Sequence, residues 1–132
     1  MISFEDFKNA CEDVFLSEKQ IFYKSLSEDK KDDHRLMETR FTNGVHIFSI
    51  WADTYSHEIG SNIECFGQIY RPQDLVYIYA PELIEKNSDF AFKDLKTIRI
   101  GISLNKNYIE KSLEILSSQG RKIIKKVKEL HF

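Results

Sequence analysis

Two runs of hydrophobic positions, rich in β-branched and aromatic residues, lie between Arg35 and Asp53 and flank the polar pair Asn43-Gly44. Asn-Gly is typical of a two-residue type I′ turn, because both residues tolerate positive φ. The pattern predicts a β-hairpin in which Thr42 pairs with Val45. Side chains alternate across a strand, so one face of this hairpin is predicted to be core. That face carries Met37, Thr39, Phe41, Phe48, Ile50 and Ala52. Because Val45–Ala52 is largely apolar on both faces, we expect an interior strand covered on both sides.

Three further runs have the composition of strands. Ile63–Tyr70 and Leu75–Ala80 flank Arg71-Pro72-Gln73-Asp74, where Pro72 suits the second position of a type I turn. Thr97–Leu104 alternates regularly, which predicts a strand with four apolar residues inward, namely Ile98, Ile100, Ile102 and Leu104.

Helices are predicted at both ends of the chain. Ser3 can cap a first helix with Asp6 three residues on, and Ser17 and Gln20 repeat this signature before a second short helix over Glu18–Leu26. Ser27–His34 is predicted to be a charged loop, and Pro81–Lys86 a single helical turn. Asn107 can cap a last helix over Tyr108–Leu130. Gly120 either allows this helix to pack closely or ends it before another helix starts.

These elements predict one α+β domain spanning residues 1–132, with an antiparallel sheet of about five strands between N-terminal and C-terminal helices. Apolar residues make up 42% and charged residues 30% of the chain, as in ordinary globular proteins. No apolar run approaches the roughly 20 residues of a membrane span, and the first residues, MISFEDFKN, have no secretory pattern. We interpret Cys11 and Cys65 as buried reduced thiols, so the expected location is cytoplasmic, with no membrane contact.

Charge is unevenly distributed. Residues 1–66 hold 7 basic and 13 acidic residues, whereas residues 67–132 hold 12 and 8, for a total of −2. The basic residues of Arg121–Lys128 suit the negative end of a helix dipole, and nucleic-acid binding is the alternative interpretation. Because the chain is acidic overall and has no groove-reading motif, a nucleic-acid partner is not the favoured reading.

Two surfaces have the chemistry of protein recognition. The first is an aromatic sheet face, which a helix would alternatively cover, made of Phe66, Tyr70, Tyr77 and Tyr79. The second is the acidic back of the first helix, made of Glu5, Glu12 and Asp13. Homodimerisation through the aromatic face stays open.

Chemistry-bearing motifs are few. The chain has no phosphate-cradling glycine loop, no Cys/His zinc pattern and no nucleophile elbow. Asp53, His57 and Glu58 form the one tight group of ligand-type residues, and with Glu64 they could support metal-assisted phosphodiester cleavage. Two or three such residues on one loop often occur by chance, so we expect no metal, no cofactor and no catalytic residue.

The sequence therefore favours a non-enzymatic protein-binding module. Its most concrete form is a bacterial or phage immunity or inhibitor protein, which neutralises a toxin or other effector, including a basic one, by surface occlusion. Bacterial immunity proteins and type III secretion chaperones share this layout, by analogy of fold alone. The alternatives are a secretion-chaperone-like binder, a metal-dependent nuclease-type enzyme using Asp53, His57 and Glu58, and a nucleic-acid-binding protein using the basic C-terminal helix.

Overall fold

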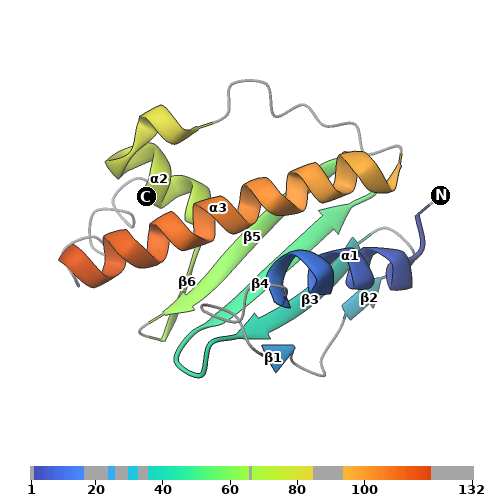
Figure 1. Cartoon of the computed structure of the whole chain (residues 1–132), viewed down its shortest axis with the longest axis horizontal. Helices are drawn as coiled ribbons and strands as arrows, with labels where there is room; N and C mark the ends of the chain where they lie inside the picture. The colour runs from blue at the N-terminus through green and yellow to red at the C-terminus, as the bar shows by residue number, and fades with distance from the viewer. Residues whose placement is uncertain are drawn as a thin grey trace.

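The computed structural model describes residues 2–16, 24–25, 30–32, 36–65, 67–84 and 94–119. Within them the fold is α+β, with an antiparallel sheet and three α-helices (Figure 1). Four strands form a meander, which consists of β3 (Leu36–Thr42), β4 (Ile47–Asp53), β5 (Glu58–Cys65) and β6 (Gln68–Tyr70). Two short strands, β1 (Lys24–Ser25) and β2 (Lys30–Asp32), pair with β3. The helices are α1 (Phe4–Leu16), α2 (Pro72–Tyr79) and α3 (Leu95–Gln119), with a 3-10 turn, η1, over Pro81–Leu83.

The central hairpin confirms the predicted core face but not the predicted turn. All six residues of that face are buried. The register differs by two residues, because Thr42 pairs with Ile47 rather than with Val45. The side chain of Asn43 accepts hydrogen bonds from the Val45 and His46 amides at 3.0 and 2.8 Å, so the connection has four residues instead of two. Since the side-chain period of a strand is 2, a slip of two leaves every side chain on its predicted face.

Helices α1 and α3 lie on the core face of the sheet (Figure 1). The predicted cap of α1 is confirmed, because Ser3 Oγ accepts a hydrogen bond from the Asp6 amide at 3.1 Å. Helical spacing then buries Phe7, Cys11 and Phe15, and the Phe15 ring stacks on Phe41 of β3 with centroids 5.1 Å apart. On the opposite sheet face Ile47, Ser49 and Trp51 are half-buried.

Thr97–Leu104 is not a strand but the beginning of α3. The Asp94 carboxylate accepts a hydrogen bond from the Thr97 amide at 2.9 Å, which caps this helix thirteen residues before the predicted cap at Asn107. The buried positions that follow have helical spacing and include Ile98, Ile102, Asn105, Ile109, Ser112 and Leu116. Ile100, which a strand would turn inward, is 45% exposed.

Of the two other predicted strands, one is wrong and the other is confirmed only in part. Leu75–Ala80 belongs largely to α2, because Pro72 occupies the first turn of a helix rather than a β-turn. Ile63–Tyr70 is divided between β5 and β6, and the reversal includes Gly67 at a φ of 73°. As turn-type residues, Gly60 and Asn62 predict a loop over residues 54–62, but β5 begins at Glu58, so both are strand residues. The predicted turn at Pro81 is confirmed over Pro81–Leu83.

Several predictions lie wholly or partly outside the described residues. They include most of the helix over Glu18–Leu26, of which Lys24–Ser25 is a strand instead, and the effect of Gly120 on the last helix. In the charged loop over Ser27–His34, Lys30–Asp32 is a strand. Cys11 is a buried free cysteine, as predicted, whereas the Cys65 side chain is not described. No helix in the described ranges is long and apolar enough to cross a membrane.

Candidate functional site

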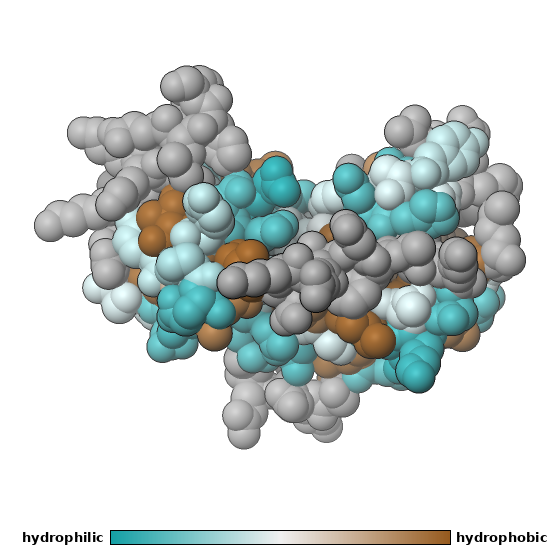
Figure 2. Space-filling view, turned by 90° about the horizontal axis from the view of Figure 1, so that it is seen from above, coloured by the Kyte–Doolittle hydropathy of each residue, from teal (hydrophilic) through white to brown (hydrophobic). Residues whose placement is uncertain are grey.

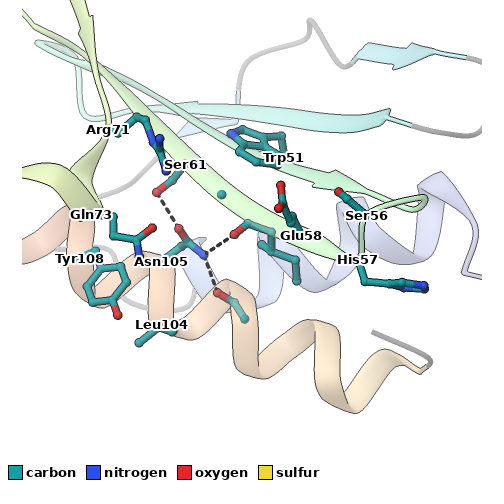
Figure 3. A pocket seen from close by; sticks show the side chains of 13 residues that line it. Trp51, Ser56, His57, Glu58, Ser61, Arg71, Gln73, Leu104, Asn105 and Tyr108 are labelled. Carbon is teal, nitrogen blue, oxygen red and sulfur yellow. Dashed lines mark hydrogen bonds between the residues drawn. The ribbon is translucent and has the colours of Figure 1, made fainter. Parts of the chain in front are cut away.

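A groove of about 480 Å³ lies where the first half of β5 meets α3 and the beginning of α2 (Figure 3). Its walls come from Trp51 of β4, from the β4–β5 turn, from β5, and from Arg71 and Gln73 at the start of α2. The face of α3 that borders it includes Asn105 and Tyr108. The lining is mostly polar, and its volume is in the range typical of ligand sites.

Asn105 ties α3 to β5 at the base of the groove. Its Oδ1 accepts a hydrogen bond from Ser61 Oγ at 2.8 Å, and its Nδ2 donates to the Gly101 carbonyl at 2.9 Å (Figure 3). A longer bond of 3.5 Å joins Nδ2 to the Ile59 carbonyl. Ser61 and Asn105 are only 6% and 8% exposed, so this network positions α3 against β5 in a place that water reaches poorly.

Two glycines bring the walls of the groove close together. A Cβ atom at Gly101 of α3 would come within 2.6 Å of Ile59 Cδ1, so the missing side chain lets the helix approach β5. A Cβ at Gly60 would overlap the indole ring of Trp51, which lies across this glycine from the neighbouring strand. An aromatic ring over a strand glycine supplies the packing that the glycine lacks.

The β5 strand is paired unequally on its two sides. β4 pairs with β5 from Glu58 to Glu64, whereas β6 pairs only with Ile63, Glu64 and Cys65. On the β6 side, residues 58–62 have no strand partner among the described residues. This edge of β5, unpaired among the described residues and called the open edge below, faces the groove.

Charged side chains mark the two ends of the groove. Arg71 is exposed at the end where β6 passes into α2, and His57 and Glu58 are exposed at the other end (Figure 3). His57 has a φ of 57°, an uncommon backbone conformation for a residue other than glycine. The groove therefore has a positive end and an end that carries a carboxylate.

The predicted group of ligand-type residues is only partly brought together. His57 and Glu58 line the groove, but Asp53 Oδ1 accepts hydrogen bonds from the Tyr55 and Ser56 amides at 2.9 and 3.3 Å and so closes the β4–β5 turn. Glu64 lies farther along β5 and pairs with Arg40 at 3.4 Å. No group of three or more His, Cys, Asp and Glu residues suited to a metal occurs in the part of the chain that the structure describes.

The predicted aromatic sheet face does not exist. Tyr77 and Tyr79 belong to α2, where Tyr77 is 65% exposed and Tyr79 half-buried, because the run that contains them is helical. Tyr70 is buried on β6, and Phe66 lies outside the described residues. The exposed large apolar residues are scattered over several elements, and apolar surface forms small patches among hydrophilic ones (Figure 2).

The predicted acidic surface is present on α1. Glu5 and Asp13 are exposed and Glu12 is half-buried. Asp13 already has an internal partner, because its Oδ2 accepts a hydrogen bond from Arg99 of α3 at 2.8 Å. Part of this charge therefore joins two helices. The basic segment Arg121–Lys128 lies outside the described residues.

Sequence reasoning named His57 and Glu58 of the groove but missed the residues that build its base. Asn105 and Ser61 are ordinary polar residues in the sequence, and only the helical spacing of Asn105 from Ile98 and Ile102 could have placed it inward. No family model matches the chain, and neither a curated protein nor a solved structure shows significant similarity to it.

Proposed function

We propose that the chain is a non-enzymatic protein-binding module, in its most concrete form an immunity or inhibitor protein that neutralises a toxin or other effector by covering its surface. The observation that carries this proposal is the open edge of β5 beside the groove. Unpaired strand edges bind other polypeptides readily, and natural proteins normally cover or blunt them. Here the edge lines a groove that has charged groups at both of its ends, and a partner with complementary charges would bind it specifically.

The enzymatic alternative has less support. Of its proposed residues, Asp53 is engaged in the turn and Glu64 is paired with Arg40, so the four side chains do not converge on one place. The nucleic-acid alternative depends on Arg121–Lys128, which the described residues do not include. A secretion-chaperone-like binder would use the same groove and differs in its partner.

The test begins with the tagged full chain as bait in extracts of the native host, at moderate salt. Each protein recovered stoichiometrically is purified, its affinity is measured by calorimetry, and its own activity is assayed with and without the chain. We expect one protein to bind and to lose its activity. An effector that binds but stays active would favour the chaperone reading, and recovery of nucleic acid alone would contradict the proposal.

A pair of charge reversals localises the binding. Arg71→Glu changes an exposed residue of the groove, and Lys96→Glu makes the same charge change at an exposed position of α3 that does not line it. We expect Arg71→Glu to weaken binding at least tenfold and Lys96→Glu to change it less than twofold. Equal affinities for both variants would show that the groove is not the binding site.

A further inference from the structure

The direction of the backbone groups on β5 follows from the hairpin beside it. The Asn43 amide donates to the His46 carbonyl, which makes these two residues a hydrogen-bonded pair. In an antiparallel ladder, hydrogen-bonded and non-hydrogen-bonded pairs alternate. By this alternation Trp51 and Glu38 of β3 form a non-hydrogen-bonded pair, so the N–H and C=O groups of Trp51 point toward β5. Trp51 is paired with Gly60, whose N–H and C=O groups therefore point toward β4. Those of Ile59 and Ser61 therefore point away from β4, into the groove.

These outward groups lie where main-chain groups are normally paired. Ser61 is 6% exposed and Ile59 half-buried, and buried N–H and C=O groups almost always have partners. The Ile59 carbonyl accepts the 3.5 Å hydrogen bond from Asn105. This bond is at the upper limit of hydrogen-bond length and uses only one of the two lone pairs of the carbonyl oxygen. No strand in the described residues supplies the other bonds.

The position beside Ile59 and Ser61 continues the line of β6. Tyr70 of β6 pairs with Ile63, and Pro72 then begins α2. The chain therefore leaves the sheet just where a longer β6 would have run along Ser61 and then Ile59. Proline removes a ladder donor and preorganises a helical first turn, so the sequence itself ends the strand here.

Resting on the proposed function, we infer that the partner supplies an extended segment of about five residues, which adds to β5 as an antiparallel strand in this position. Main-chain hydrogen bonds to Ile59 and Ser61 hold the segment, as in other β-strand additions. Because the segment runs antiparallel to β5, its N-terminal end lies beside Arg71 and its C-terminal end beside Glu58. The complementary segment is acidic at its first residues and basic at its last.

The experiment uses purified full-length protein and a displayed library of random dodecapeptides as the probe. We expect selected peptides to share an acidic residue followed, about four positions later, by a basic one. Their binding is measured by calorimetry and by the fluorescence of Trp51, the one tryptophan of the chain, which lines the groove.

Backbone methylation then tests the strand geometry. Each selected peptide is synthesised with one N-methyl group at successive positions, which removes a single amide donor. We expect a loss of at least tenfold in affinity at alternate positions and less than threefold at the positions between. Exchange of the Ile59 and Ser61 amides, followed by NMR, should slow at least tenfold on binding, while Gly60 and Asn62 serve as internal controls and stay unchanged.

Three results would overturn the inference. They are a methylation profile without alternation, selection of no binding peptide, and slow exchange at Ile59 and Ser61 in the free protein. Slow exchange in a free monomer would mean that the edge is paired within the chain, and slow exchange in a dimer that a second copy occupies it. A profile without alternation, or selection of no binding peptide, leaves the proposed function standing if the host partner still depends on Arg71. An edge paired within the chain would also remove the observation that carries the proposed function, so the two failures are distinguishable.

Discussion

The hydrogen-bond network between α3 and β5 makes a quantitative prediction. Asn105→Ala removes three hydrogen bonds and leaves the buried Ser61 hydroxyl without its acceptor. At about 1 kcal/mol for each typical bond, with the 3.5 Å bond contributing least, we expect the free energy of unfolding to fall by about 2–3 kcal/mol. Ser61→Ala removes one of these bonds and should cost about 1 kcal/mol. Because both variants lose the same 2.8 Å bond, the double variant should be less destabilised than the sum of the two, by about 1 kcal/mol.

The assay is urea unfolding followed by circular dichroism, with Asn107→Ala as the matched control on the same helix. Asn107 is exposed in the middle of α3, so replacing it with alanine should raise stability by a few tenths of a kcal/mol through helix propensity. If a helix began just after Asn107, the same change would remove its cap and cost about 1 kcal/mol. Additivity of Asn105→Ala and Ser61→Ala within about 0.3 kcal/mol would refute the coupling, and a destabilising Asn107→Ala would refute the continuous helix.

Two further predictions concern the cap of α3 and the ring over Gly60. Hydrogen bonds from the Thr97 amide and hydroxyl hold the pKa of Asp94 below its usual range. The stability that this lowering provides is complete above the ordinary carboxyl pKa and is lost as the pH falls through the lower folded-state pKa. Asp94→Asn, which keeps an N-cap acceptor, should flatten this part of an acid-unfolding curve, and an unchanged slope would contradict the assignment. Gly60→Ala should lower the free energy of unfolding by about 1–2 kcal/mol, because the new methyl group meets the Trp51 ring. In denaturant unfolding, the same change should cost much less in a Trp51→Ala background, and an equal cost would refute the clash.

The sequence was sufficient to predict which side chains are buried in the central hairpin. The hairpin faces could be predicted because side chains alternate across a strand, and buried residues do alternate with less buried ones along β3 and β4. The turn could not, because Asn43 uses its side chain to accept two amides, and propensity alone does not distinguish that geometry from a two-residue loop. The predicted faces are nevertheless correct, because the observed register differs from the predicted one by two residues, which is an even number.

Helix α3 shows why the other strands were misassigned. In Thr97–Leu104 every second residue is Ile or Leu, and β-branched residues favour strands, so both local signals indicate a strand. The same residues also satisfy a helical period, since Ile98 and Ile102 lie four apart and continue through Ile109 to Leu116. A short window cannot separate the two periods, whereas a window that spans the whole of α3 can. The capping pair Asp94 and Thr97 was the local signal for the helix.

The groove could not be predicted for a related reason, because it depends on how two of these elements end. An uninterrupted strand from Ile63 to Tyr70, as predicted, would leave no short β6 and no half-paired β5. The reversal near Gly67 creates β6, and Pro72 ends it after three residues by starting α2. The open edge of β5 is thus a consequence of two local backbone preferences, positive φ at a glycine and helix initiation at a proline. Each can be recognised in the sequence, but their joint effect on a third strand appears only when the strand pairing is known. The same reasoning explains why the predicted aromatic face was lost, since the helix that opens this edge also removes Tyr77 and Tyr79 from the sheet.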